Sequence, residues 1–531
     1  MRKINSVFVL SLFILTIGCG GLAPVNTIQA APNLTGVTQT LVDLLEKQDK
    51  TKISAEDYQS TSLAQIITFA TPAGYRLKLR YLEFGVSLVE ALKAARDPDL
   101  RKRLIEMVQW SRNPKVRAQA IITLASLGDP LHKKYFKEAV LDGKIGIRFA
   151  AVEALQTWGQ AEAISLLQLA KDRDWSPLMQ IVAAQALLSL GQESAVDALW
   201  KGLDHNSWVV RAMAARYLGD YGNPNDYPKI VSYLNRETRN DFVIAELSIA
   251  ALKLISKKGE KSSYSPSQKA WRDNEEVAYT IGRDSAIELE PLVITPPRLK
   301  IPASLQIAAQ INSGLLKLIR DRLGEPLDPI QQQDPILEEL NSMVTPSGFA
   351  LKTRYSELSY LLIEALGGTT DPLMRSELQR LAQNSTNPLV KASALIALSY
   401  SRDESDIYLV QDALADKNAI VRMGALEAVE VGRFKSAIPY VYNLAGNDAS
   451  AAVQVYALQV LAKFGETSPR LSFLARLNDP DWPSRAMSYW YLSRYGTSDD
   501  YSQVLSRLGI EENPFVQAEI ALATLRLAPV E

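Results

Sequence analysis

The sequence predicts an all-α protein, an α-solenoid of helix–turn–helix repeats that is duplicated as two arrays. Three observations predict it. The stretch at 71–92 recurs without a gap at 345–366, and 12 of the 22 positions are identical. Within each half, Ala- and Leu-rich segments follow turns at a spacing of 31 or 32 residues. No regularly spaced series of alternating apolar and polar residues competes with this helical pattern.

The composition describes a balanced surface that faces water. The chain has 531 residues, 22% of them charged, and a net charge of −1 at pH 7. It is too long for one ordinary core, and its charge argues against a nucleic-acid binder that relies on a basic face. Two histidines and a single cysteine leave almost no ligands for a metal site built from those residues. We therefore expect no metal and no cofactor.

The N-terminus predicts export. A short basic region precedes an apolar run at 7–17, which is shorter than the ~20 residues of a membrane span but suits a secretory signal. The run ends at Gly18-Cys19, which resembles the lipobox of bacterial lipoproteins. The resemblance implies an exported lipoprotein of the bacterial cell envelope, anchored through Cys19 on the periplasmic side. Cleavage near Ala30, which would give a soluble periplasmic or secreted protein, and an uncleaved anchor are the alternatives.

A constant offset of 274 residues relates the two halves well beyond the opening stretch. It carries Trp208 onto Trp482. One residue drops out near the end, so that Phe242 matches Phe515. We therefore predict a tandem duplication, with a signal peptide at 1–19, a tether at 20–40, a first array at 41–255, a polar and then Pro-rich linker at 256–310, and a second array at 311–531.

Each half repeats a shorter unit, in which a turn precedes a marker side chain and an Ala/Leu-rich helix then ends at or near Gly. The markers are Arg117, Arg148, Gln180 and Arg211, and in the second half Lys391, Arg422, Gln454 and Arg485. Such a unit cannot bury its apolar face alone, so neighbouring units must stack. We expect the marker arginines to hydrogen-bond turn carbonyls and the aspartates of the neighbouring unit. Binding of phosphate or carboxylate groups is the alternative.

These units resemble HEAT repeats, especially the short HEAT-like units of phycobilisome lyases. Asp142 with Arg148, and Asp416 with Arg422, match the Asp–Arg pairing of that family. The resemblance covers most of both arrays. It implies the fold more than the function, because the same fold serves scaffolds, adaptors, lyase subunits and DNA-repair glycosylases. The third unit of each half carries Gln in place of Arg, which interrupts the expected ladder of charges.

The duplicated opening stretch predicts a scaffold helix. Thr71-Pro72 fits an N-cap followed by proline at the first helical position. Apolar residues recur every three or four positions on one face, at Leu77, Tyr81, Phe84, Leu88 and Leu92. We expect its charged residues to form a solvent-facing column, with Arg80 paired to Glu83 along the helix. Glu83 and Glu90 are seven residues apart, about 10 Å along a helix, which is too far for an acid–base pair.

Aromatic residues in the fourth unit of each half are the candidate partner-binding surface. The second helices of such units line the concave face, and Tyr, Trp and Arg are enriched in binding hot spots. The candidates are Arg216, Tyr217, Tyr221, Tyr489, Trp490, Tyr491 and Tyr495. Packing of these side chains in the core between units is the alternative.

We therefore expect a non-catalytic, membrane-tethered scaffold or adaptor that binds a protein or peptide partner on concave helical faces. The sequence has neither a Gly-rich phosphate loop nor a Ser-centred nucleophile elbow, and no catalytic residue is identified. One alternative is a lyase-like or carbohydrate-active enzyme that uses carboxylates and aromatic residues on one concave face. The other is a structural spacer in an envelope assembly.

Overall fold

A computed structural model describes residues 34–47, 59–69, 71–95, 98–238, 240–257, 303–322, 333–356, 358–367 and 371–529. Every regular element within these ranges is a helix, so the all-α prediction is confirmed for the described part of the chain. The predicted signal peptide with Cys19, and most of the predicted tether and linker, lie outside these ranges.

The helices of the first half, in chain order, are α1 (Thr35–Glu46), α2 (Thr61–Thr68), α3 (Pro72–Leu82), α4 (Phe84–Ala94), α5 (Pro98–Trp110), α6 (Pro114–Ser126), α7 (Lys133–Val140), α8 (Ile145–Trp158), α9 (Ala161–Arg173), α10 (Pro177–Ser189), α11 (Val196–Gly202), α12 (Trp208–Tyr221), α13 (Tyr227–Arg236) and α14 (Asp241–Lys257). Those of the second half are α16 (Ala303–Arg322), α18 (Pro335–Asn341), α19 (Pro346–Ser356), α20 (Leu358–Leu366), α21 (Pro372–Asn384), α22 (Pro388–Ser399), α23 (Ile407–Leu414), α24 (Ala419–Gly432), α25 (Ile438–Asn447), α26 (Ala451–Lys463), α27 (Ser468–Ala475), α28 (Trp482–Tyr495), α29 (Tyr501–Leu508) and α30 (Pro514–Leu527). Helix α1 begins inside the predicted tether, and α16 spans the predicted boundary between linker and second array.

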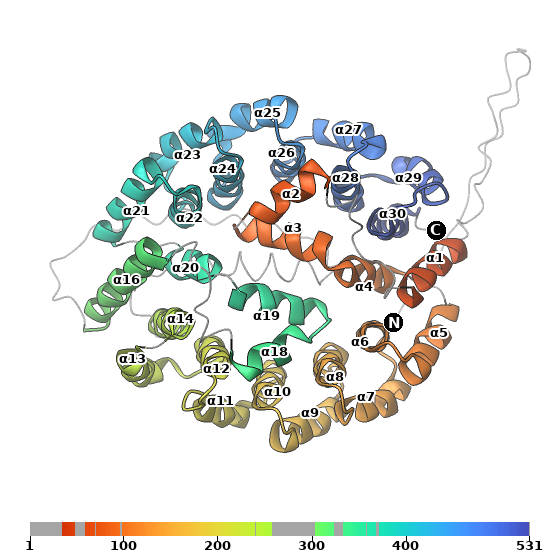
Figure 1. Ribbon diagram of the computed structural model, residues 1–531, viewed down its shortest axis with the longest axis horizontal. Coiled ribbons are helices and arrows are strands. Elements are labelled where there is room, and N and C mark those ends of the chain that lie inside the picture. The colour runs from red at the N-terminus through yellow and green to blue at the C-terminus, as the bar shows by residue number, and fades with distance from the viewer. Residues whose placement is uncertain are drawn as a thin grey trace, which may run out of the picture.

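The helices form one closed ring (Figure 1). Along each arc the first helices of the units lie on the outer rim, and the second helices lie on the inner side. Helix α14, at the end of the first array, packs on α20 at the start of the second, and α30 packs on α4 and α1. The two arrays therefore share two junctions, and the C-terminal helix closes the ring on the N-terminal helices.

Local sequence sets the ends of the inner helices. Side-chain N-caps start α6, α10, α12 and α26, as the turn before each marker predicts. Gly159, Gly191 and Gly465 follow or end inner helices with φ of +62°, +81° and +87°, which confirms the expected C-terminal glycines. Gly222 differs, since its φ is −68°. A Cβ there would lie 2.4 Å from the Leu218 carbonyl oxygen, so close backbone approach is what requires glycine.

Each junction is sealed by an ion pair between the duplicated stretch of one half and the last helix of the other half. Arg80 in α3 contacts Glu519 in α30 through both carboxylate oxygens, with Nη2 donating to Oε2 at 2.6 Å. Arg354 in α19 contacts Glu246 in α14 in the same way, at 2.6 and 2.8 Å. All four residues are buried. Offsets of 274 and 273 residues relate the arginines and the glutamates, so the two junctions are copies of each other.

Aromatic rings pack beside each ion pair. The ring of Trp482 lies 5.2 Å from that of Phe515 and 6.2 Å from that of Tyr81, measured between centroids. Its duplicate Trp208 lies 5.2 and 6.0 Å from the corresponding Phe and Tyr rings of the other junction. Each aromatic cluster again draws residues from both halves, so apolar packing and ionic contact close the ring at the same places.

Two short hairpins, α2–α3 and α18–α19, lie in the centre of the ring (Figure 1), and each is held by the opposite half. Ser60, just before α2, donates to Asp481 at 2.5 Å, and Asp481 precedes α28. Asp334, just before α18, accepts from Ser207 at 2.8 Å, and Ser207 caps α12. The serine donor thus precedes the hairpin in one copy and precedes the ring helix in the other, and the aspartate acceptor takes the opposite place. The hairpins meet the ring on the side where the inner helices begin.

A glutamate at the same position of each array lies at the start of the central helix from the other half, and Glu427 is buried whereas Glu153 is half-buried. Both carboxylate oxygens of Glu427 in α24 accept from the backbone N–H of Ala73, at 3.0 Å. Glu153 in α8, its duplicate, lies within hydrogen-bond reach of Thr345 and Ser347 at the start of α19. Burial raises the pKa of Glu427 to about 7, although a nearby arginine and the Ala73 N–H oppose the shift.

The duplicated stretch is two helices, and the expectation of one continuous helix is wrong. Helix α3 ends at Leu82 and α4 begins at Phe84, with Glu83 between them at φ −117° and ψ +86°, outside the helical region. The second copy is divided in the same way into α19 and α20. The break lets the two helices pack in different places. Helix α3 lies in the central hairpins, whereas α4 packs in the ring against α6 and α30.

The expected solvent-facing column of charges is also wrong. Arg80 is 4% exposed, and its ionic partners are Glu519 and Glu90 rather than Glu83. Spacing along one helix suggests an outward face only when nothing else packs there. Here α30 of the other half covers that face.

The marker residues link consecutive units as predicted. Arg148 donates from Nη1 to the Asp142 carbonyl at 3.0 Å and from Nε to the Asp174 carboxylate at 2.8 Å. The same pattern, a carbonyl six residues before and a carboxylate 26 residues after, recurs at Arg211, Arg422 and Arg485. Gln180 donates to the Asp174 carbonyl at 2.7 Å, and its neutral amide cannot add the ionic contact.

The Asp–Arg pairing runs between units rather than within one turn. The carboxylate of Asp142 pairs with Arg117 of the preceding unit at 2.9 Å, while Arg148 reaches the Asp142 carbonyl. Lys391 pairs with Asp416 at 2.8 Å in the second half. Each turn aspartate therefore ties its own unit to the marker of the unit before it.

Candidate functional site

Most of the predicted partner-binding aromatic residues belong to the core. Tyr489, Trp490 and Tyr491 in α28 are 1%, 8% and 0% exposed, and Tyr217 in α12 is 8% exposed. Tyr491 also donates its hydroxyl to Gln459 at 2.8 Å inside the fold. The prediction that these four residues contact a partner is therefore wrong, and the core-packing alternative holds. The physical reason is that α28 is enclosed by α26, α27, α30 and the central α2.

The other three candidates keep some accessible surface. Tyr221 is 37% exposed, and its hydroxyl accepts from Gln185 at 3.3 Å. Arg216 and Tyr495 are half-buried. The seven predicted residues do not form one surface, because α12 and α28 lie on opposite arcs of the ring (Figure 1).

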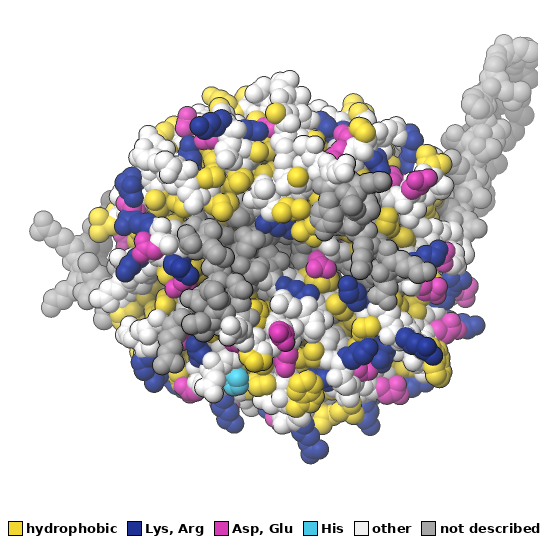
Figure 2. Space-filling model, in the orientation of Figure 1, with side chains coloured by type: hydrophobic (Ala, Val, Ile, Leu, Met, Phe, Trp, Pro, Cys, Tyr) yellow, Lys and Arg dark blue, Asp and Glu magenta, His cyan; other side chains and the backbone are white. Residues whose placement is uncertain are grey.

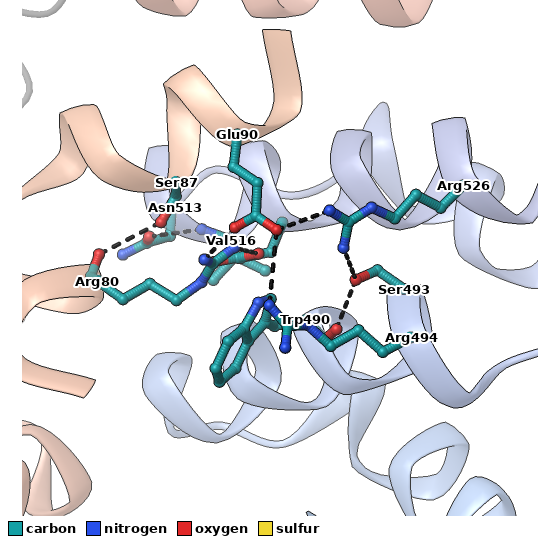
Figure 3. Close-up of polar contacts among 10 residues, drawn as sticks. Arg80, Ser87, Glu90, Trp490, Ser493, Arg494, Asn513, Val516 and Arg526 are labelled. Atoms are coloured by element: carbon teal, nitrogen blue, oxygen red, sulfur yellow. Dashed lines mark hydrogen bonds and ion pairs between the residues drawn. The ribbon is translucent and has the colours of Figure 1, made fainter. Parts of the chain in front are cut away.

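Charged side chains gather instead where α3 and α4 meet α28 and α30 (Figure 3). Three arginines surround Glu90, with Arg80 Nη1 at 2.5 Å, Arg526 Nη2 at 2.8 Å and Arg494 Nη2 at 3.8 Å from its carboxylate oxygens. The indole of Trp490 lies beside Arg80 and Arg494, and each guanidinium carbon is 4.6 Å from the ring centroid. We call these five residues the junction cluster.

The junction cluster has fixed protonation states. Burial alone would raise the pKa of Glu90, but the three arginines hold it at about 2. Burial lowers the pKa of Arg494, as do the neighbouring Arg80 and Arg526, while Glu90 opposes the shift. A carboxylate that stays ionised and guanidinium groups that stay protonated cannot exchange a proton at neutral pH. The cluster therefore stabilises the junction through opposite charges that stay ionised.

The other junction has diverged from this arrangement. The duplication places Asp220 at the position of Arg494 and Lys253 at that of Arg526. Lys253 pairs with Asp220 at 3.0 Å, so these two charges neutralise each other. This junction keeps the Arg354–Glu246 ion pair. Among the described residues, the cluster of three arginines occurs only at the junction where α30 meets α3 and α4.

Within the described ranges, no group of three or more His, Cys, Asp or Glu side chains is arranged to hold a metal ion. In the same part of the chain, none of the helices is both long and apolar enough to cross a bilayer. A pocket of about 490 Å³ opens beside α1, lined by Glu46, Arg103, Glu106, Met107, Ser111 and Val116. It borders the turn between α5 and α6.

Exposed apolar side chains follow the turns of the first array. Trp110, Leu141 and Trp175 are 77%, 63% and 68% exposed. They lie just before or within the turns that lead into α6, α8 and α10. We call these three residues the turn edge. Their positions could be found from the sequence, since each precedes a marker by five or seven residues. A single apolar residue in or beside a turn does not reveal, however, whether its side chain is exposed.

A second exposed group lies on outer helices of the second array, on the rim of the ring (Figure 1). Tyr408 in α23, Tyr440 and Tyr442 in α25, and Leu471 in α27 are between 39% and 66% exposed. We call these four residues the outer row. The duplicated positions of Tyr408, Tyr442 and Leu471 are polar in the first array: Lys134, Gln168 and Asp197. That difference between copies was the signal that could have identified the row.

Comparison with known proteins bears on the repeats. A family model described as HEAT repeats matches residues 86–156, 101–187, 165–253 and 438–524. Both halves contain HEAT repeats. The matched segments lie along the arcs of the ring, and the α-solenoid prediction is confirmed.

Solved structures of karyopherins are similar to the chain at low identity. Kap121p alone is 13% identical, with 93% of this chain and 50% of that chain covered and a TM-score of 0.33. Kap121p bound to Nup53p is 13% identical, with 94% and 53% covered and a TM-score of 0.33. Kap95p with RanGDP is 12% identical, with 92% and 66% covered and a TM-score of 0.34. The chain spans about half the length of the Kap121p chains. No curated protein matches it.

Proposed function

We propose that this protein is a non-catalytic scaffold of the bacterial cell envelope, tethered to the membrane through Cys19, which binds a protein or peptide partner. The observation that carries the proposal is the outer row on α23, α25 and α27. Three of its four residues, Tyr408, Tyr442 and Leu471, stand where the first array has polar or charged residues at matched positions, and Tyr440 is 44% exposed where the first array has the buried Leu166. Tyrosine is enriched in binding hot spots, where a large apolar area and a hydroxyl act together.

The surroundings of the outer row suit a protein surface. Its neighbours Pro439 and Asn443 are exposed and uncharged. Tyr442 donates its hydroxyl to Glu466 at 2.5 Å, which fixes the ring on the surface. A preorganised aromatic side chain loses little entropy when a partner binds.

The central hairpins occupy part of the concave faces, and this favours the outer row as the place of partner contact. Helices α10, α12, α26 and α28 contact α2 or α18, so the chain's own segments take up inner surface. We therefore place partner contact on the outer rim of the second array rather than on the concave faces.

The test is photo-crosslinking in the native host. A photoreactive phenylalanine analogue replaces Tyr442 or Leu471 in the full chain, and adducts are separated by gel electrophoresis. We expect one discrete adduct from both positions, at the same added mass. The combined change Tyr408→Ser, Tyr440→Ser and Tyr442→Ser should abolish the adduct formed from position 471.

The first array supplies the matched control. The same analogue at Gln168 or Asp197, the duplicated positions, should give no such adduct. Equal adducts from both arrays would show that the row has no special role, and the proposal would fail. An absence of adducts at all four positions would favour a structural spacer in an envelope assembly.

The tether is tested separately. Replacing Cys19 with Ala should move the protein from the detergent phase to the aqueous phase on Triton X-114 partitioning. Unchanged partitioning would contradict lipidation at Cys19 and favour an uncleaved anchor. Wild-type protein in the aqueous phase would favour cleavage near Ala30.

A further inference from the structure

We propose that the turn edge of the first array is a membrane-contact surface that rests on anionic lipid headgroups. The proposal adds a second membrane contact to the proposed function, and it does not require acylation of Cys19. It rests on the exposure of the turn edge, on the basic residues around it, and on the loss of both in the duplicated array.

The turn edge presents its side chains along one side of the ring. Each of its three residues lies shortly before an inner helix begins, and α6, α8 and α10 pack side by side in that order. Neighbouring packed helices are 8–10 Å apart, so the row extends roughly 20 Å. Trp110 and Trp175 are large amphipathic rings, which are enriched at the level of lipid headgroups. A row of this length can contact one flat surface.

Basic side chains accompany the turn edge. Arg112, Lys115, Lys144 and Arg173 lie in or beside the same turns and are exposed. Figure 2 shows Lys and Arg side chains around the rim of the lower half, over the first array, with apolar side chains between them. Exposed tryptophan with nearby lysine and arginine is the composition of a surface that binds anionic lipid.

The carboxylates of these turns are engaged in the fold. Asp142 pairs with Arg117 at 2.9 Å, and Asp174 pairs with Arg148 at 2.8 Å in the interior. Asp172 is exposed and accepts from Gln168 and Lys171. The exposed charge of these turns is therefore mainly positive, which is complementary to an anionic bilayer and not to another copy of the same edge.

The second array provides a natural comparison on the same backbone. The duplicated positions of the turn edge carry Asn384, Ala415 and Ala449. The duplicated positions of the four basic residues carry Thr386, Leu389, Asn418 and Asn447. All four positive charges and all three large apolar side chains are thus absent from one copy. Folding of a HEAT unit does not need them, because the second array folds without them.

The placement agrees with an anchor at Cys19, which belongs to the proposed function. Thr35 at the start of α1 lies 16 positions after Cys19, a reach of at most ~55 Å when fully extended. Helix α1 packs on α5, whose last residue is Trp110. An acylated Cys19 and the turn edge can therefore contact one membrane together.

The test is vesicle flotation of the chain from residue 20, which keeps every residue that the structure describes and lacks the cysteine. We expect it to float with phosphatidylglycerol-containing vesicles and much less with pure phosphatidylcholine, and to be released by 0.5 M NaCl. Brominated lipids should quench tryptophan fluorescence. The combined change Trp110→Ser, Leu141→Ser and Trp175→Ser should reduce the partition coefficient at least ten-fold and abolish the quenching.

Each basic residue changed to Gln, among Arg112, Lys115, Lys144 and Arg173, should weaken binding roughly five-fold. The matched control is Asn384→Ser, Ala415→Ser and Ala449→Ser, which should bind like wild type. The reverse transplant, Asn384→Trp with Ala415→Leu and Ala449→Trp, should strengthen binding. Circular dichroism confirms that each variant is folded.

Unchanged vesicle binding by the folded turn-edge triple variant would overturn the proposal. So would concentration-dependent dimerisation that the triple variant abolishes while wild type ignores vesicles, since the edge would then bind a second copy. Neither result touches the crosslinking at Tyr442 or the partitioning of the Cys19→Ala variant, which decide the proposed function independently.

Discussion

Arg80 and Glu519 are 439 residues apart in the sequence and form a bidentate ion pair in the interior of the ring, with Nη2 and Oε2 2.6 Å apart. Arg354 and Glu246 repeat the contact at the opposite junction. In each pair the arginine comes from the duplicated stretch of one half and the glutamate from the last helix of the other half. Each half therefore supplies the arginine of one junction and the glutamate of the other, and these two contacts close the ring.

Arg80→Ala should destabilise the protein by about 3–5 kcal/mol, because Glu519 would stay buried without its counter-charge. Burial opposes the charged form of Arg80, but Glu519 and Glu90 raise its pKa, so the arginine stays charged. Burial raises the pKa of Glu519, and Arg80 opposes that shift. Urea unfolding followed by circular dichroism measures the loss. Arg101→Ala, which breaks the partly exposed pair with Asp129, is the control and should cost about 1 kcal/mol or less. Equal losses for both variants would contradict the closure role.

The features that the sequence predicts correctly are local ones. The helical period, the marker spacing and the turn glycines depend on residues within one or two units, and Arg148 lies only 26 residues from Asp174. Contacts of this range leave a repeating pattern in the sequence. The duplication adds strength to it, since two copies of each unit agree.

The features that it misses depend on partners from the other half. Nothing near Arg80 indicates that Glu519 will cover it, so a charge on one helix is naturally assigned to solvent. Tryptophan is typical of binding surfaces, so the sequence alone suggests that Trp490 contacts a partner. In the structure α30 and the side chains of Arg80 and Arg494 enclose it. Exposure of Trp110 is the converse case, because it is the last residue of α5 and the helical period does not continue into the turn that follows.

Arg148→Gln should cost about 3 kcal/mol, because Asp174 would lose its buried ionic partner. The third unit of each half naturally carries Gln at this place, and Gln180 keeps the carbonyl contact at 2.7 Å. The variant therefore isolates the ionic part of the link. Adding Asp174→Asn to Arg148→Gln should recover part of the loss, as a double-mutant cycle in urea would show. No recovery would mean that the cost arises from packing against Trp175 rather than from charge.

Cutting the chain between the arrays should leave the ring assembled. A protease site inserted within 258–302 is cleaved in the folded protein, and the two pieces are then run together on size exclusion at 150 mM salt. They should co-elute, because α2–α3 packs on the second half and α18–α19 on the first. Adding Arg80→Ala and Arg354→Ala should let the pieces separate at lower protein concentration. Separation of the wild-type pieces would show that the chain connection, not the exchanged hairpins, holds the halves together.

Glu427→Gln should stabilise the protein at pH 8 and have little effect at pH 5. Burial raises the pKa of Glu427 to about 7 from its usual 4.5. Between these values the folded state keeps a proton that the unfolded state has released, so stability falls as pH rises through the window. A difference of about 2.5 pH units corresponds to about 3 kcal/mol of stability lost by pH 8. Glutamine removes that loss, because its neutral amide oxygen can still accept from the Ala73 N–H.

Thermal melting of wild type and Glu427→Gln at pH 5, 6.5 and 8 measures the effect as a difference between the two proteins, which cancels the other titrating groups. The gain in Tm should grow steadily with pH. Glu106→Gln, on the exposed surface of α5, should show no such trend. If the gain instead shrank with rising pH, the carboxylate would be stabilising the start of α3 in its ionised form, and the N-terminal dipole of that helix would outweigh the cost of burial.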